Sequence, residues 1–182
     1  MRPATLEDAP GILAIYRPFI EHTAVTFEYA VPSLDEFRAR MASIIGTYPY
    51  LVAEQAQQPG EAEPTASRRV VGYAYAHRMG ERAAFQWNAE LAVYLAPEAR
   101  GQGLGERLVR QLEKELAAMG IRNLFSLITA DNEASLRLHE KLGFTQVGYH
   151  PNAGYKLGRW HDLVYVRKPI GSFEGEPRPL AQ

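Results

Sequence analysis

A short glycine-rich turn between a predicted strand and a predicted helix constrains this sequence more than any other feature. Apolar side chains alternate with other side chains over residues 90–95, as in a strand, and Pro97 ends the alternation. Residues 100–105 read Arg-Gly-Gln-Gly-Leu-Gly, and such backbone can adopt positive φ angles and come close to a ligand. Leucines then recur every fourth residue over residues 104–116, which predicts an amphipathic helix.

A helix that opens directly out of a glycine turn presents unpaired N–H groups and the positive end of its dipole. A phosphate is the ligand that suits such a site best. The spacing here is G-x-G-x-G, so the turn is neither the dinucleotide fingerprint G-x-G-x-x-G nor a Walker loop, which needs Gly-Lys-Ser/Thr. A turn that binds no ligand stays open as the alternative.

Composition excludes several classes of protein. The net charge of −1 provides no basic field for nucleic acid or an anionic membrane, and no apolar run approaches the roughly 18 residues of a membrane span. The absence of cysteine excludes disulfides, thiolate metal sites and a cysteine acyl-enzyme, and favours a cytoplasmic protein. The five histidines show no metal-ligand spacing, so we expect no metal.

Periodicity along the 182 residues predicts one α+β (mixed α/β) domain over residues 1–170. The expected order is ααββββαβαββ or close to it: a mixed, mostly antiparallel twisted sheet with helices on both faces. Residues 1–4 could add a short edge strand. Residues 55–68 are predicted to be a solvated hairpin loop, and residues 171–182 a disordered tail. The other predicted strands cover residues 50–54, 69–77, 124–129, 144–149 and 161–167.

Two motifs resemble the GCN5-related N-acetyltransferase (GNAT) superfamily. The turn Arg100-x-x-Gly103-x-Gly105 is similar to its pyrophosphate loop R/Q-x-x-G-x-G/A. The segment from Asn132 to Phe144 resembles the one in which an Asn contacts the pantetheine arm and a helix ends in Y-x-K-L-G-F. The two motifs stand in the order found in the superfamily, and the resemblance covers roughly residues 1–168.

Within the superfamily, six segments resemble the phosphinothricin / L-methionine sulfoximine acetyltransferase family. They are Tyr48-Pro-Tyr-Leu-Val-Ala-Glu54, Gly72-Tyr-Ala-Tyr, Arg82-x-Ala-Phe85, Trp87-x-x-Glu90, Leu136-Arg-Leu-His-Glu140 and Gly154-Tyr-Lys-x-Gly-x-Trp-His-Asp162. The resemblance implies acetyl-CoA as co-substrate, a small-molecule amine as acceptor and a homodimer. Without cysteine, direct acetyl transfer within a ternary complex is favoured.

The expected coenzyme contacts follow from the two motifs and the strand between them. The turn and Arg100 would hold the pyrophosphate, and the strand backbone could pair with the pantetheine amides. The expected residues are Ala92, Val93, Tyr94, Arg100, Gly101, Gln102, Gly103, Leu104, Gly105, Asn132 and Ser135.

Glu90 and His139 are the candidate catalytic residues. A carboxylate within an apolar strand is costly to bury, and burial would raise its pKa towards a range useful for taking a proton from the amine. An edge glutamate or an ion-pair partner is the alternative for Glu90. The family resemblance implies His where many superfamily members have Tyr, so His139 could serve as acid or relay, or could simply be packed.

The substrate side needs a cation for a carboxylate and a wall for a side chain. Arg82 matches the family's substrate arginine, with Arg78 as the near alternative, and Phe27, Glu28 and Phe85 would form the wall. A packed connecting loop around Phe27 and solvated arginines are the alternatives. Two other functions also stay open: acetylation of another amine, such as a protein N-terminus or an ordinary amino acid, and a non-catalytic acyl-CoA sensor.

Overall fold

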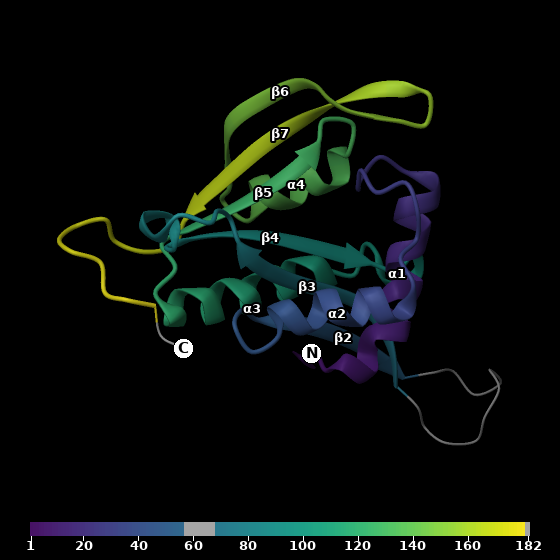
Figure 1. The fold of residues 1–182 in the computed structure, drawn as a ribbon, viewed down its shortest axis with the longest axis horizontal. Coiled ribbons are helices and arrows are strands. Elements are labelled where there is room, and N and C mark those ends of the chain that lie inside the picture. Colours follow the sequence, from purple (N-terminus) through teal and green to yellow (C-terminus); the bar gives the residue numbers. More distant parts are fainter. Residues whose placement is uncertain (57–67, 181–182) are drawn as a thin grey trace.

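One mixed sheet in the order β1-β2-β3-β4-β5-β7-β6 forms the centre of the protein (Figure 1). This computed structural model describes residues 1–56 and 68–180. The strands are β1 (Arg2–Pro3), β2 (Tyr50–Ala56), β3 (Arg68–Arg78), β4 (Asn88–Leu95), β5 (Asn123–Thr129), β6 (Thr145–Lys156) and β7 (Arg159–Pro169). The helices are α1 (Ala9–His22), α2 (Leu34–Ile44), α3 (Leu104–Met119) and α4 (Glu133–Lys141), with short 3-10 turns η1 (Leu6–Asp8), η2 (Ala83–Phe85) and η3 (Pro97–Ala99).

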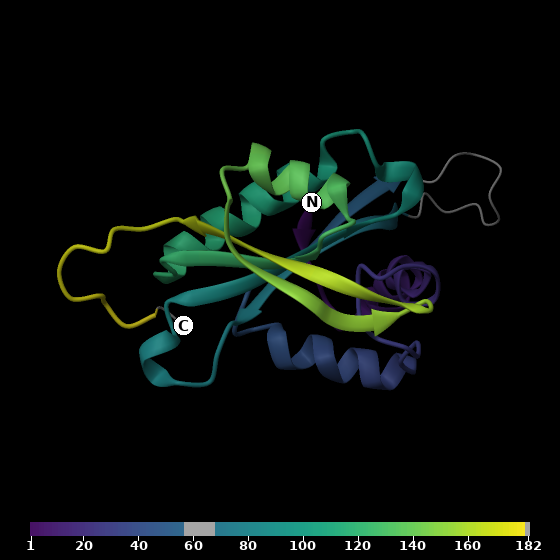
Figure 2. The same cartoon turned by 90° about the horizontal axis from the view of Figure 1, so that it is seen from above.

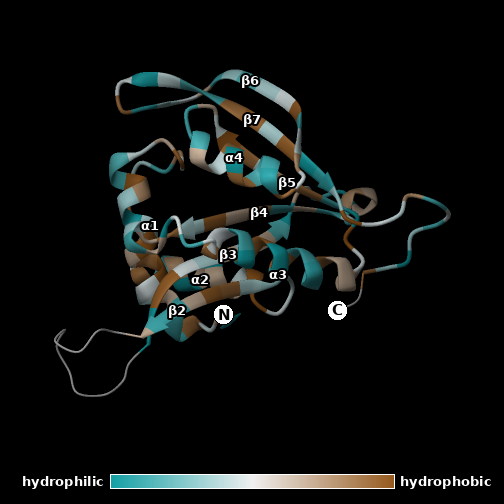
Figure 3. Ribbon diagram, turned by 180° about the vertical axis from the view of Figure 1, so that it is seen from behind, coloured by the Kyte–Doolittle hydropathy of each residue, from teal (hydrophilic) through white to brown (hydrophobic). Residues whose placement is uncertain are grey.

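The helices cover the two faces of the sheet in pairs. Figure 2 shows α1 and α2 on one face and α3 and α4 on the other. The leucine stripe of α3 explains its placement, because Leu108, Leu112 and Leu116 are fully buried against the sheet. In Figure 3 the outer turns of α3 are hydrophilic, while the central strands carry long hydrophobic stretches. Burial of each leucine contributes roughly 2 kcal/mol.

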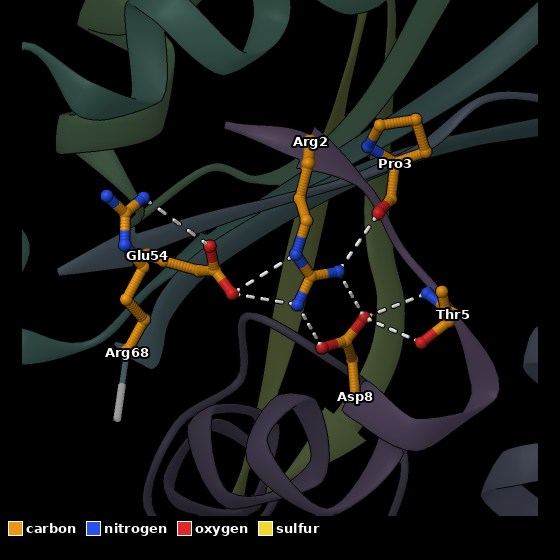
Figure 4. Close-up of polar contacts among 6 residues, drawn as sticks. All are labelled: Arg2, Pro3, Thr5, Asp8, Glu54 and Arg68. Atoms are coloured by element: carbon orange, nitrogen blue, oxygen red, sulfur yellow. Dashed lines mark hydrogen bonds and ion pairs between the residues drawn. The ribbon is translucent and has the colours of Figure 1, made fainter. Parts of the chain in front are cut away.

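A polar cluster explains how a strand of two residues holds its place at the sheet edge (Figure 4). The Arg2 guanidinium donates to both Asp8 carboxylate oxygens, at 2.8 and 2.6 Å, and to Glu54 Oε1 at 3.1 and 2.8 Å. The hydrogen bonds from Arg2 hold the pKa of the Asp8 carboxyl below its ordinary value. β1 is thereby tied to η1 and β2.

The parallel contact of the sheet is short. β4 pairs with β5 only from Asn88↔Asn123 to Glu90↔Phe125, and the other neighbouring strands are antiparallel. β4 then continues to Leu95 and β5 to Thr129 without further pairing between them. A gap in the ladder therefore opens after Glu90, between two strands that run in the same direction.

The predicted fold class is confirmed, and the predicted order was wrong in one place. Three strands, β2, β3 and β4, lie between α2 and α3 where four were predicted, and the edge strand that residues 1–4 could add is β1, ahead of α1. β6 and β7 also extend past the predicted ends and form a long hairpin that turns at residues 157–158. Most of the predicted loop 55–68 lies outside the described residues, although β2 includes Gln55 and Ala56.

The C-terminal segment has contacts that composition did not predict. Residues 170–180 form no helix or strand, but the Trp87 indole donates to the Arg178 carbonyl at 2.9 Å. Leu180 packs against the hydrophobic core, and the Arg167 guanidinium lies 5.5 Å from the centre of the Phe173 ring. In residues 1–56 and 68–180, no helix combines the length and the apolar composition that a membrane span requires.

Candidate active site

The glycine turn leads from β4 into α3 in left-handed backbone. Gly101 has a φ of 73° and Gly103, the N-cap of α3, a φ of 70°. A Cβ built on either glycine meets no atom of the described chain within 4 Å. Backbone conformation, not crowding within the chain, therefore requires glycine here, and the space before the turn is open to a ligand.

The N-terminus of α3 has the properties of an anion site. No side chain caps it within the described residues, so its first N–H groups stay available. Glu106, the one acidic residue of its first turn, accepts from Arg110 at 2.9 Å and lies 2.7 Å from Lys141. These cations, Lys141 foremost, hold the pKa of Glu106 below its ordinary value and offset its charge near an anion.

The gap between β4 and β5 opens beside this turn. Beyond Glu90 the β4 backbone has no strand partner on its β5 side, although the Ser126 hydroxyl donates to the Leu91 carbonyl at 3.1 Å. Because the two strands are parallel, the turns that follow them meet at one edge of the sheet. Asn132 caps α4 there, its Oδ1 accepting from the Ser135 N–H at 3.2 Å. This arrangement fits a pyrophosphate at the turn and an amide-bearing arm along β4.

Glu90 faces α1 and α2. It shares its face of β4 with Tyr94, which makes edge contacts with Tyr16 and Phe19 of α1 at centroid distances of 5.1 and 5.2 Å. The Glu90 carboxyl is 28% exposed, and its Oε1 lies 3.9 Å from His77 Nε2. Burial raises the pKa of Glu90, and the charge of His77 partly offsets the rise. A carboxylate with a raised pKa is a stronger proton acceptor than an ordinary one.

A small cavity on the same face reaches from Tyr75, the neighbour of Glu90 across the sheet, to Glu28. Burial, with the Glu90 and Glu28 charges, raises the pKa of Tyr75 to about 12, so its hydroxyl stays protonated. The cavity has about 60 Å³, room for a few waters and not for an amino acid. Its lining residues are Tyr16, Glu28, Phe37, Arg40, Met41, Ile44, Tyr50, Tyr73 and Tyr75.

His139 lies on the other side of the sheet. α4 packs beside α3, where a Cβ on Gly105 would lie 3.3 Å from Leu138. The His139 ring is 1% exposed, and its Nδ1 lies 2.8 Å from the Ser135 carbonyl, which can only accept. Nδ1 therefore carries the proton, and Nε2, which has no partner in the described residues, is a lone-pair acceptor. Burial lowers the pKa of His139, so the ring is neutral at pH 7.

No hydrogen bond or ion pair joins Glu90 to His139 within the described residues. Glu90 belongs to β4, the strand that borders the gap. His139 belongs to α4, the helix after β5, which covers the face of the sheet opposite to α1 and α2 (Figure 2).

The predicted substrate residues fall into two groups. Phe27 packs against Gly154 and His161 of the β6–β7 hairpin. Arg78 ends β3, and Arg82 and Phe85 belong to the turn that leads into the start of β4, whereas the segment between α1 and α2 lies by the other end of β4 (Figures 1 and 2). Of the five predicted substrate residues, all within the described chain, Glu28 alone lines the small cavity.

Within each group the contacts differ. Glu28 is already engaged, since Arg40 donates to both of its oxygens at 2.8 Å and Tyr16 donates to Oε1 at 2.9 Å. Arg78 donates to the Glu81 carbonyl at 2.9 Å, while the exposed Arg82 side chain has no polar partner in residues 1–56 and 68–180. Arg82 is thus the freer cation.

Sequence reasoning did not single out three residues that adjoin the site: Tyr75, His77 and Arg40. Tyr75 and His77 share one face of β3 and pair across to Ala92 and Glu90. The alternation of large side chains along β3 was a usable signal. Arg40 gave none, because its contact with Glu28 joins a helix to a loop.

Known proteins resemble this chain over almost its whole length. A family model described as an acetyltransferase (GNAT) domain matches residues 1–165. A phosphinothricin N-acetyltransferase of Alcaligenes faecalis is 35% identical over 168 residues, 91% of this chain and 80% of that protein. An L-methionine sulfoximine/L-methionine sulfone acetyltransferase of Pseudomonas aeruginosa PAO1 is 34% identical, covering 97% of this chain and 98% of its own length. The crystal structure of a GNAT superfamily phosphinothricin acetyltransferase from Sinorhizobium meliloti, in complex with AcCoA, has a TM-score of 0.87 at 34% identity, over 97% of this chain and 91% of that one.

Proposed function

Since this chain belongs to the GNAT family of N-acetyltransferases, we propose that it acetylates the α-amine of a small amino-acid-like substrate. L-methionine sulfoximine, phosphinothricin and methionine sulfone are the candidate acceptors, because the relatives bear these names. The observation that carries the proposal is the half-buried Glu90 carboxyl, with its raised pKa, where β4 and β5 diverge. The amine is acetylated directly in a ternary complex, as suits a chain without cysteine.

Acetyl-CoA, which brings the acetyl group as a thioester, fits the turn and the gap. The open space at Gly101 and Gly103 and the uncapped α3 N-terminus support a pyrophosphate site there. The β4 backbone at residues 92–94 supports pairing with the amide-bearing arm. Arg100, whose guanidinium lies 5.4 Å from the Phe19 ring centre, stands at the rim of the turn as a phosphate partner.

Glu90 acts as the base in this proposal. The ammonium group of the substrate transfers a proton to the Glu90 carboxylate, directly or through a water, and the neutral amine becomes the nucleophile. The amine attacks the thioester carbonyl, the C–S bond breaks as the C–N bond forms, and coenzyme A leaves as a thiolate that takes up a proton. His139 then serves as a relay of a proton to this thiolate more readily than as a direct acid. Its Nε2 has no proton to give in the tautomer that Ser135 fixes, so it must first accept one.

Arg82 is the proposed partner of the substrate carboxylate, because Arg78 is engaged with Glu81. Replacing Arg82 with glutamine is expected to raise KM for the amino acid roughly tenfold, with a smaller change in kcat, since a charged hydrogen bond is lost. Steady-state kinetics with the substrate and its decarboxylated analogue measure the effect. Arg82→Gln should add no further loss with the analogue, and an equal loss with both compounds contradicts the assignment. Arg78→Gln is the matched control.

A substrate panel tests the function itself. Thiol release from acetyl-CoA is measured with L-methionine sulfoximine, L-phosphinothricin, methionine sulfone, free amino acids and a basic peptide. Turnover confined to the first three supports the narrow proposal. Turnover with the peptide or ordinary amino acids alone replaces the substrate class, and coenzyme binding without turnover supports an acyl-CoA sensor.

The β6–β7 hairpin supports a homodimer. β6 is an edge strand, and five large apolar side chains of the hairpin are about half exposed or more. A second copy of the chain is the partner expected to cover them, as the family resemblance implies. These residues are Val147, Tyr149, Tyr155, Leu157 and Trp160. Sedimentation equilibrium should give twice the 20.4 kDa chain mass, and Trp160→Ser should shift the mass towards the monomer.

A further inference from the structure

The tip of the β6–β7 hairpin holds the segment that joins α1 to α2. The Lys156 Nζ donates to the Thr26 carbonyl at 2.8 Å, and the Tyr29 hydroxyl donates to the Tyr155 carbonyl at 2.5 Å. The Phe27 ring lies on Gly154 so closely that a Cβ there would come within 2.5 Å of it. Three successive hairpin residues thus contact the segment 26–29.

Lys156 is unusual among these contacts, because its side chain is buried. The residue is 4% exposed, and its ammonium group donates to a carbonyl and has no carboxylate partner within the described chain. Desolvation accordingly lowers the pKa of Lys156, and the charge of Glu28 opposes part of that shift. Burying an ammonium group without a carboxylate partner costs free energy. This cost indicates that the contact has a role in fixing the segment 26–29 in place.

Thr26 links Lys156 to Glu28 through a chain of hydrogen bonds. Its carbonyl accepts from Lys156, while its hydroxyl lies 2.7 Å from the Tyr16 hydroxyl. Tyr16 in turn donates to Glu28 at 2.9 Å, and Arg40 holds the other side of that carboxylate. Lys156 is therefore connected to Glu28, which lines the small cavity together with Tyr75, a residue within reach of the Glu90 charge.

The same tip is anchored to the coenzyme edge of the sheet. The buried His161 ring has its Nε2 3.0 Å from the Lys156 carbonyl and its Nδ1 3.2 Å from Asp131. Asp131 directly precedes Asn132, the cap of α4. The hairpin tip thus spans from the turn after β5 to the α1–α2 segment.

We propose that Lys156 is a positioning residue for substrate binding. It fixes the segment 23–29 against the hairpin, so that Phe27 and Glu28 lie where the amino-acid substrate contacts them. The inference rests on the proposed function, because it assigns this segment to the acceptor side of the site. Lys156 itself touches no reacting atom. Its effect passes through the Thr26 carbonyl, and acetyl-CoA binding is independent of it.

Lys156→Met tests the proposal against Lys168→Met. Methionine keeps an unbranched apolar side chain but loses the ammonium group. Lys168 is a matched control, because its Nζ contacts Glu113 at 2.7 Å between β7 and α3, away from the segment 23–29. Hydrogen–deuterium exchange of the peptide over residues 23–29 and steady-state kinetics with the best amine of the panel are measured on both variants.

In Lys156→Met, exchange over residues 23–29 is expected to accelerate and KM for the amine to rise roughly tenfold, with kcat within about threefold and KM for acetyl-CoA unchanged. Exchange equal to that of the wild type, or an equal rise of the amine KM in Lys168→Met, overturns the proposal. A wild type without turnover on any amine refutes the proposed function instead, and the exchange measurement still decides whether Lys156 fixes the segment.

Gly154→Ala is the second variant, for the case that Lys156→Met does not fold. Its added methyl group lies 2.5 to 2.7 Å from three Phe27 ring atoms, so the ring must move, while the buried ammonium group stays. The same rise in the amine KM without a change for acetyl-CoA is expected. An unchanged amine KM with a displaced Phe27, seen by faster exchange of residues 23–29, overturns the role of the segment.

Discussion

Replacement of Glu90 with glutamine is expected to lower kcat by about a hundredfold or more, the usual contribution of a positioned general base. Glutamine keeps the size and the hydrogen-bonding oxygen of the side chain but cannot take up the amine proton. The coenzyme dissociation constant should stay within about threefold, because Glu90 lies at the start of the β4–β5 gap and the proposed phosphate site lies beyond its far end.

The pH dependence gives a second measure of the same residue. Burial raises the pKa of Glu90, so kcat/KM should fall as pH drops through a value above that of an ordinary carboxyl. The substrate amine titrates as well, and only its neutral form is a nucleophile. The pH profile of kcat/KM therefore has two limbs, one from Glu90 and one from the substrate amine. Two acceptors whose amine pKa values differ separate them, because only the substrate's limb shifts with the acceptor. In Glu90→Gln the enzyme's limb should vanish while the substrate's limb remains.

The control for this variant is Glu54→Gln, because Glu54 is also a strand carboxylate but is bound to Arg2 at the far side of the sheet. Its kcat should match the wild type even if its unfolding temperature falls. Equal losses of kcat and of coenzyme affinity in Glu90→Gln would show that Glu90 supports the fold or the coenzyme site and is not the base.

Local signals in the sequence were enough to predict most of the architecture. The leucine stripe and the bounding glycines of α3 act within one helix, and the Ser33 capping box acts within one turn of α2. The lengths of β6 and β7 were missed because residues 150–160 are mixed in composition and mostly exposed, and are held by pairing across the hairpin. The position of β1 likewise depends on Arg2 reaching Glu54, 52 residues away.

The candidate site likewise contains residues that local sequence predicts and residues whose role depends on contacts between distant parts of the chain. Glu90 stood out because a lone carboxylate interrupts an apolar strand, and the glycine turn stood out by its spacing. Lys156 did not, since its burial arises only when the hairpin tip meets Thr26, 130 residues earlier in the chain. His161 and Asp162, adjacent on β7, point to opposite faces as strand alternation requires: His161 contacts Asp131, whereas Asp162 binds Tyr149 and the Asn152 N–H.

Valine in place of Gly103 is expected to weaken coenzyme A binding on the order of a hundredfold or more, because about two charged hydrogen bonds from the turn to phosphate oxygens would be lost. The residue has a φ of 70°, which a β-branched side chain rarely adopts, so the turn must shift. If the glycine conformation is kept instead, the new side chain fills the open space before the turn. Calorimetric titration with coenzyme A measures the effect.

Gly46→Val separates the loss of the phosphate site from the general cost of such a substitution. Gly46 also has a positive φ, of 92°, and a Cβ there also meets no described atom within 4 Å, but it follows α2, away from the turn. Both variants should lose similar stability in thermal unfolding, roughly 1–2 kcal/mol for a residue forced into left-handed backbone. Only Gly103→Val should lose coenzyme affinity.

Gly103→Asn refines the result, because asparagine tolerates left-handed backbone. Restored binding would mean that the loss in Gly103→Val comes from the changed conformation of the turn. Continued loss would mean that it comes from a side chain standing where the phosphates would bind. Affinity unchanged in Gly103→Val would mean that the turn is not the pyrophosphate site.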